Sequence, residues 1–283
     1  MTNGAREDAM DSIFTRDGAA WVPTSAARGP WGASLHGGAP AALLAQQLDA
    51  VPDRPGPLAR LTLDLFRPVP LAPLEVSVRA LRIGRRLAVH EAVLSAEGRE
   101  LVRAVAVHGD ERPLPEPLPP PPCPLPPLDD LEAEPELSLA AAFAAGGEGV
   151  RSRPRAGDDG LHHRLRVRRG EGAPGSGRCS AWLRLPLDLA PGVPLTPVGH
   201  LAACADFANG LSQRIVPTEG GSLGFINADI SLHLLREPAP GAIAMVARNE
   251  THGAGRALVS AECGQADGLV ARITQTALVM DRG

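Results

Sequence analysis

Two stretches of the sequence are apolar on nearly every side, and they predict two enclosed helices. The first covers residues 37–48 and carries a proline in its first turn, where proline is tolerated. The second covers residues 198–215, after Thr196 as a candidate N-cap and Pro197 at the first turn. A helix that lacks a polar face is stable only where other elements surround it. Both helices are therefore expected in the centre of a fold.

Each predicted helix is followed by long runs in which apolar residues alternate with polar ones, a pattern typical of strands. The runs are 74–81, 87–95 and 100–107 in the first half, and 243–249, 257–263 and 269–280 in the second. The halves also share a turn, in which Arg67 and Arg236 precede prolines at an offset of 236 − 67 = 169 residues. The same offset superimposes Arg79, Gly84 and Arg103 on Arg248, Gly253 and Arg272. The repeat predicts a duplicated α+β fold, in which each antiparallel sheet wraps around one central helix.

A proline-rich segment separates the two halves. Ten of the fifteen residues from 113 to 127 are proline, which excludes a helix or a central strand and favours extended polyproline II. An acidic, alanine-rich stretch then continues to residue 149. The prediction is an N-terminal domain over 1–112, a linker over 113–149 and a C-terminal domain over 150–283.

Composition narrows the class of protein. No apolar run approaches the ~20 residues that span a bilayer, and residues 1–16 lack the apolar core of a signal peptide, so we expect a cytoplasmic protein without a membrane segment. The four cysteines are too far apart in sequence for a CxxC motif, which argues against zinc and redox sites and predicts reduced thiols. We predict no metal and no cofactor.

All 28 basic residues are arginine, and the net charge is −4. A cluster at Arg164, Arg166, Arg168 and Arg169 alternates along a predicted strand, with few aromatic residues to stack on bases. We interpret this cluster as a solvated strand face and expect no nucleic-acid partner.

Three polar residues stand out as candidates for chemistry. Asp206 lies within an otherwise apolar helix, so it is either functional or part of an exposed stripe with Asn209 and Gln213. Gln275 is the only polar residue on one face of the last predicted strand, where either a function or a structural hydrogen bond would explain it. Its counterpart at the offset of 169 is Ala106, which predicts one such site per chain.

Asn227 is the third candidate. The apolar alternation around it places Ile226 on the inner face and Asn227 on the outer face, so a solvated position is the simple interpretation. A functional Asn227 would require a β-bulge that turns it inward, or a cover over that end of the strand.

In this order and spacing, the residues resemble a known family. Ala205-Asp206-Phe207, Asn227-Ala228-Asp229 and Thr274-Gln275-Thr276 are similar to the catalytic segments of the double-hotdog acyl-CoA thioesterase II family. The segment 31–38, which ends in His36-Gly37-Gly38, resembles the start of the central helix in hotdog thioesterases. The resemblance implies two tandem hotdog domains, an acyl-CoA substrate and a homo-oligomer. Two positions depart from the family: Asn227 replaces its usual threonine, and Ala39 replaces a glutamine.

The resemblance also implies roles for these residues. Asp206 would activate a water as general base, while Asn227 and Gln275 would orient that water. The oxyanion would be bound by amides at a helix N-terminus, either Gly37 and Gly38 or Gly199 and His200, because such amides lack intrahelical partners.

Two other functions remain possible on the same fold. An enoyl-CoA hydratase or dehydratase would need an Asp and His pair, and by sequence only His200 lies near Asp206. A non-catalytic acyl-CoA-binding protein would explain the departures at Asn227 and Ala39.

Two motifs are rejected. Gly170 to Gly175 fits G-x-G-x-x-G, but Pro174 and Gly177 prevent the helix that a dinucleotide site needs, so a hairpin loop is expected. His162 and His163 are adjacent on a predicted strand and would point to opposite faces, which is poor geometry for a metal.

Overall fold

A computed structural model gives the fold of the chain. It describes residues 11–30, 33–116, 118–126, 137–139, 141, 159–173, 175–219 and 221–282. Trp31 and Gly32 of the segment that resembles hotdog thioesterases lie outside the described residues, as does most of the acidic stretch. Within the described part of the chain, no helix is both long enough and apolar enough to cross a membrane.

The two central helices form where the apolar pattern predicts them. They are α2 (Gly38–Asp49) and α5 (Pro197–Ser212). Thr196 caps α5 as predicted, since its hydroxyl accepts a hydrogen bond from the Gly199 amide at 3.1 Å. The α5 helix ends at Ser212, three residues before the predicted end.

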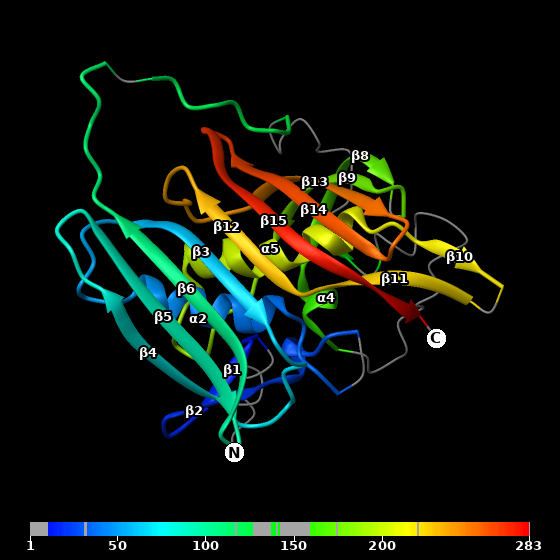
Figure 1. Ribbon diagram of the computed structural model, residues 1–283, viewed down its shortest axis with the longest axis horizontal. Helices are drawn as coiled ribbons and strands as arrows, with labels where there is room; N and C mark the ends of the chain where they lie inside the picture. The colour runs from blue at the N-terminus through cyan, green and yellow to red at the C-terminus, as the bar shows by residue number, and fades with distance from the viewer. Residues whose placement is uncertain are drawn as a thin grey trace.

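The strands form one large antiparallel sheet around these helices (Figure 1). In the N-terminal half they are β3 (Leu58–Leu65), β4 (Glu75–Arg82), β5 (Leu87–Ala96) and β6 (Arg99–Gly109). In the C-terminal half they are β7 (Leu137–Ser138), β8 (Arg166–Ala173), β9 (Arg178–Arg184), β10 (Val216–Thr218), β11 (Gly221–Asn227), β12 (Asp229–Leu234), β13 (Ile243–His252), β14 (Arg256–Gln265) and β15 (Gly268–Arg282). Near the N-terminus, the hairpin of β1 (Phe14–Asp17) and β2 (Ala20–Pro23) and the 3-10 turn η1 (Ser25–Ala27) lie outside this sheet.

The two half-sheets meet edge to edge. The strand order is β4-β5-β6-β3-β12-β15-β14-β13-β9-β8-β7, so β3 and β12 join the halves. The joint is sealed on its inner face because Leu63 pairs with Ile230, Leu61 pairs with Leu232, and all four side chains are buried. The fold is thus the expected pair of sheet-and-helix domains, with their sheets continuous with each other.

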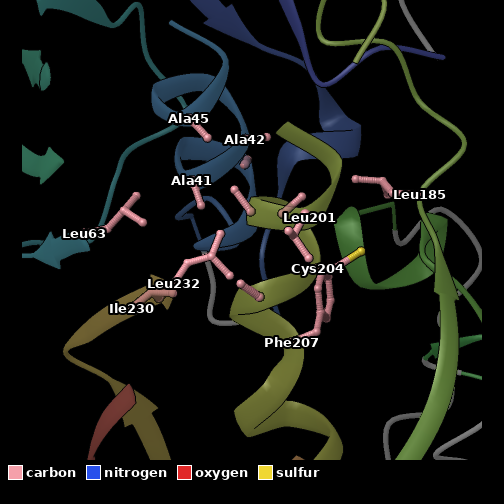
Figure 2. Packing of buried hydrophobic residues seen from close by; sticks show 14 of the residues in the cluster. Ala41, Ala42, Ala45, Leu63, Leu185, Leu201, Cys204, Phe207, Ile230 and Leu232 are labelled. Atoms are coloured by element: carbon pink, nitrogen blue, oxygen red, sulfur yellow. The ribbon is translucent and has the colours of Figure 1, made fainter. Parts of the chain in front are cut away.

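Small residues let the two helices approach closely at the centre of the core. Ala41, Ala42 and Ala45 of α2 face Leu201 of α5, and all four are inaccessible to solvent (Figure 2). Removing this apolar surface from water contributes roughly 25 cal/mol per Å². The packing fixes α5 against α2, and so fixes the position of Asp206.

The proline-rich segment runs over the surface of the C-terminal half. The Trp182 indole donates to the Pro126 carbonyl at 3.1 Å, and the Leu269 amide donates to the Pro121 carbonyl at 2.8 Å. Leu125 packs with Trp182 and Ala244 in a small second cluster. The segment is therefore attached to the sheet at its C-terminal end.

The fold also tests the predictions for the glycine-rich run, the cysteines and the two adjacent histidines. The glycine-rich run near Gly170 lies in the β8–β9 hairpin, as predicted. All four cysteines are free thiols. The prediction of a strand at His162 and His163 is wrong, because they lie on the short helix α4 (Leu161–Arg164). Arg164 also belongs to α4, so it is not part of the strand that carries Arg166.

Candidate active site

Asp206 lies on the inner side of α5 and is 7% exposed. The alternative of an exposed stripe is wrong, because Asn209 and Gln213 are buried as well. Asn209 and Gln213 both donate to the Phe225 carbonyl, at 2.9 and 3.5 Å, so they tie α5 to β11. Asp206 makes different contacts, and these come from both halves of the chain.

His36 is the titratable side chain that contacts Asp206. Its Nδ1 lies 2.8 Å from Asp206 Oδ2, and the two side chains are 13% and 7% exposed. At this distance from a carboxylate, Nδ1 carries a proton and donates it in a hydrogen bond. The His36 ring stacks on Phe207, with centroids 4.1 Å apart and planes 21° apart, and the His36 amide donates to the Ala27 carbonyl. Phe207 therefore holds one face of the His36 ring, and η1 holds the His36 backbone.

Gly37 and Gly38 bring the start of α2 against this carboxylate. A Cβ on Gly37 would lie 2.7 Å from Asp206 Oδ1, so a side chain at this position would displace the carboxylate. A Cβ on Gly38 would lie 2.8 Å from the Ala203 carbonyl oxygen. The Gly38 amide lies 3.1 Å from His36 Nδ1 and also donates to Asp206. The predicted pair of glycines is thus brought together with Asp206.

A β-bulge turns Asn227 toward Asp206. On β15, Asn227 pairs with Ala277 and Ser231 pairs with Thr274, so four steps on one side (231 − 227) face three on the other (277 − 274). The extra residue reverses the inner and outer faces between β11 and β12. The expectation that Ile226 points inward is wrong for this reason: Ile226 is 44% exposed, and its neighbour Phe225 is 3% exposed.

Asn227 then contacts the carboxylate directly. Its Nδ2 donates to Asp206 Oδ1 at 2.9 Å and to the Asp206 carbonyl at 3.2 Å. Its Oδ1 is buried and has no hydrogen-bond partner among the described residues. Asn227 therefore offers one satisfied donor and one free acceptor beside the carboxylate.

Gln275 is the lone polar side chain on a buried face, as predicted. It is 0% exposed, between Ile273 and Ala277, which are also buried. Its Nε2 donates to the Ala205 carbonyl at 2.9 Å, one residue before Asp206, while its Oε1 is buried without a partner in the described structure. Gln275 and Asn227 thus each present an unpaired amide oxygen near Asp206.

The environment of Asp206 keeps it ionised. Burial alone raises the pKa of this carboxyl group. The charge and hydrogen bond of His36, followed by the hydrogen bonds from Asn227 and Gly38, outweigh burial and lower the pKa below its ordinary value. A carboxylate at neutral pH, with three hydrogen-bond donors and adjacent free acceptors, can receive a proton from a bound water.

The amides of the alternative pair, Gly199 and His200, already have hydrogen-bond partners at the start of α5. The Gly199 amide donates to the Thr196 hydroxyl and the His200 amide donates to the Thr196 carbonyl, so neither is available to an oxyanion. The His200 ring contacts other residues than Asp206. Its Nε2 accepts a hydrogen bond from the Leu185 amide at 3.0 Å and lies 3.7 Å from Cys204 Sγ.

His36 is the residue of the candidate site that the sequence pattern does not predict. It stood in the sequence directly before Gly37 and Gly38, as a titratable residue at the N-terminus of a buried helix. Nothing in the spacing placed it beside a residue 170 positions later, since 206 − 36 = 170. The statement that only His200 lies near Asp206 is corrected by this contact.

The fold and the buried carboxylate define a double-hotdog protein with a site at the junction of its two domains. Residues 27–109 match the model of the acyl-CoA thioesterase N-terminal domain, and residues 127–279 match that of the C-terminal domain. Together these cover most of the chain, and the protein belongs to the acyl-CoA thioesterase family. It is accordingly a thioester hydrolase.

Solved structures agree on the fold. A conserved protein of unknown function with a hotdog fold from Alicyclobacillus acidocaldarius is 20% identical, with 100% of each chain covered and a TM-score of 0.68. The acyl-CoA thioesterase II TesB2 from Mycobacterium marinum is 17% identical, covering 99% of this chain and 98% of that one, with a TM-score of 0.58. At this identity the likeness concerns the fold. No curated protein matches the sequence.

Proposed function

We propose that the protein hydrolyses an acyl-CoA to the free acid and CoA by attack of a water that Asp206 activates. The observation that carries this proposal is the set of polar atoms around one buried carboxylate. Asn227 Oδ1 and Gln275 Oε1 are buried acceptors without partners in the described residues, on two side chains that bond to Asp206 and to the residue before it. Buried acceptors are costly unless a ligand or water donates to them, at about 1–3 kcal/mol each.

In the proposed step, the water oxygen forms a bond to the thioester carbonyl carbon while its proton moves to the Asp206 carboxylate. The second O–H of the water donates to the amide oxygen of Asn227 or of Gln275, which fixes the direction of the attacking oxygen. The tetrahedral intermediate then expels the CoA thiolate, which takes the proton from Asp206 and so restores the carboxylate. The start of α2 at Gly37 and Gly38 supplies the partial positive charge suited to the transient oxyanion.

His36 has a supporting part in this proposal. Its N–H holds Asp206 Oδ2 at 2.8 Å, which orients the carboxylate and favours its charged form. Because Asp206 and His36 come from opposite halves, the site needs both halves of the chain.

The contact between Asp206 and His36 also meets the requirement of a hydratase, which uses an acid and a histidine to move water across a double bond. Release of free thiol from a panel of acyl-CoAs of increasing chain length separates the two functions. We expect thiol release with saturated acyl-CoAs. Loss of enoyl absorbance without thiol release would instead favour the hydratase, and binding without either change would favour a non-catalytic protein.

A further inference from the structure

Three hydrogen-bond acceptors remain open at the buried carboxylate, and a single water cannot satisfy all of them. An ionised carboxylate has about four acceptor positions, and Asp206 fills three of these with the donors described above. Its last position is therefore the first open acceptor. The other two are Asn227 Oδ1 and Gln275 Oε1, which are buried without a partner in the part of the chain that the structure describes. A water donates only two hydrogen bonds, so one acceptor is left over.

The positions of the two amides decide which acceptor the water leaves open. Asn227 bonds to Asp206 itself, at 2.9 Å from its Oδ1, so a water on the carboxylate lies next to the Asn227 amide. Gln275 bonds instead to the Ala205 carbonyl, one residue earlier. Asn227 pairs with Ala277, two residues beyond Gln275 on β15, so the two amides are diagonal neighbours with Cα atoms roughly 7–8 Å apart. The second O–H of the water therefore belongs to Asn227, and Gln275 Oε1 needs another donor.

The side chains around Gln275 are apolar. Ile273 and Ala277 flank it on the inner face of β15, and Val259 lies opposite it on β14. All three of these side chains are buried. An ordered water needs several polar partners, which such walls do not offer. The CoA part of a substrate carries phosphates that are costly to bury, whereas the acyl chain gains from apolar walls. The missing donor is therefore expected on the acyl chain.

We propose that the preferred substrate is a 3-hydroxyacyl-CoA, whose hydroxyl donates a hydrogen bond to Gln275 Oε1. The third carbon of the chain is two bonds from the carbonyl carbon, so its hydroxyl lies beside the attacking water and reaches past it toward Gln275. A site that hydrogen-bonds a substrate hydroxyl discriminates against an analogue without it, because the buried partner then stays unsatisfied. Saturated acyl-CoAs are therefore slower substrates. The inference rests on the proposed acyl-CoA hydrolysis and names its substrate class.

Substrates of one chain length test this assignment on the wild-type protein. Thiol release gives kcat/KM for decanoyl-CoA, for each enantiomer of 3-hydroxydecanoyl-CoA and for 3-fluorodecanoyl-CoA. Fluorine is close to a hydroxyl in size and in electron withdrawal, but it cannot donate a hydrogen bond. We expect kcat/KM for one hydroxy enantiomer to exceed the values for the saturated and fluorinated substrates by about tenfold or more, because that enantiomer alone satisfies Gln275 Oε1.

The variant Gln275→Leu assigns the preference to a residue. It removes the acceptor, so kcat/KM for the favoured hydroxy enantiomer and for decanoyl-CoA should come within about twofold of each other, whatever happens to their absolute values. Gln213→Leu is the matched control, because Gln213 is also a buried glutamine whose Nε2 donates to a backbone carbonyl, that of Phe225. This control should keep the wild-type preference for the hydroxyl.

Equal kcat/KM for the hydroxy and fluoro substrates in the wild-type protein would overturn the substrate assignment and leave the proposed hydrolysis standing. An undiminished preference for the hydroxyl in Gln275→Leu would do the same. If Gln275→Leu does not fold, the comparison of hydroxy and fluoro substrates on the wild-type protein decides alone. Absence of thiol release from every substrate would instead refute the proposed function.

Discussion

At the scale of single residues, the central feature is a buried carboxylate whose charge is maintained by neighbours. His36, Asn227 and Gly38 together lower the pKa of Asp206 against the effect of burial. Burying an unpaired carboxylate would cost several kcal/mol, so the contacts with these neighbours are what permit Asp206 to exist as a base inside α5.

Replacement of His36 tests this balance. In His36→Phe, the ring can still stack on Phe207, but the partner that most lowers the pKa of Asp206 is lost. The pKa of Asp206 should rise, so at low pH a larger fraction of the enzyme carries a protonated, inactive Asp206. We expect the acid limb of the kcat/KM profile to move to higher pH, measured by thiol release from pH 4.5 to 8.5. An unchanged acid limb would contradict the role given to His36.

Replacement of Gln275 tests whether its buried amide acts in catalysis or only stabilises the fold. Its Oε1 is buried without a partner in the described structure, so Gln275→Leu removes an unsatisfied acceptor along with one hydrogen bond to Ala205. We expect the free energy of unfolding to change by less than about 1 kcal/mol, while kcat falls at least about tenfold. Urea unfolding and thiol release measure the two quantities. A destabilised variant with normal kcat would indicate a purely structural glutamine.

Some of these residues could be predicted from the sequence and others could not. Gln275 was visible because every neighbour on its strand face is apolar, and a regular strand preserves that alternation. Regular alternation puts Asn227 on the outer face, and it is the alternative of a β-bulge that the structure shows: one extra residue between β11 and β12 turns Asn227 inward. His36 was missed because its role depends on a contact between the two halves, which no local pattern encodes.

At the scale of elements, the short helix α4, at the start of the C-terminal half, packs against Gly38 and His36 of the candidate site. Leu161 is 0% exposed and packs where a Cβ on Gly38 would meet it, and His162 lies parallel to His36 at 6.5 Å. Asp159 holds this segment, because it accepts from Ser25 at 2.6 Å and from Arg164 at 2.9 and 3.0 Å. Burial raises the pKa of Asp159, yet these hydrogen bonds prevail and bring it to about 2.

Asp159→Asn should loosen α4 without touching the reacting atoms. We expect a loss of about 1 kcal/mol in the free energy of unfolding, because the group is partly exposed and its charge is screened. We also expect kcat/KM for acyl-CoA to fall several-fold, since α4 supports Gly38 and His36. Asp110→Asn, which removes another arginine partner at a surface position, is the control. Equal kinetics in both variants would show that α4 does not support the site.

At the scale of the whole molecule, the two halves share one sheet, and both contribute residues to the candidate active site. The division into 1–112, 113–149 and 150–283 remains our proposal for the domains, with β3 and β12 as their junction. The double architecture was predictable because apolar helices and alternating strands repeat along the chain. The joining of the half-sheets was not, because edge pairing depends on packing between distant segments.

Two buried histidines predict that the whole molecule loses stability in acid. Burial and the charges of His90 and Arg54 lower the pKa of His108 to about 4, and the pKa of His200 is also about 4. The unfolded chain takes up these protons near pH 6.5, so stability is complete above that pH and is lost as the pH falls toward 4. We expect a decrease of up to about 1.4 kcal/mol per pH unit for each histidine.

In His108→Leu, the free energy of unfolding should change less between pH 7 and pH 4.5 than it does in the wild-type protein, when both are measured in urea. His233→Gln, at an exposed position, should leave the dependence as it is. Equal slopes for His108→Leu and the wild-type protein would contradict the assignment.

Activation of the attacking water by the Asp206 carboxylate is tested by measuring kcat for thiol release in Asp206→Asn. The amide keeps the shape of the side chain but cannot accept the proton of water. We expect kcat to fall about 10²–10⁴-fold while S-decyl-CoA, a thioether that cannot be hydrolysed, still binds. Glu262→Gln, an exposed acid paired with Arg272, is the control and should keep normal activity. Wild-type kcat in Asp206→Asn would contradict this role of Asp206.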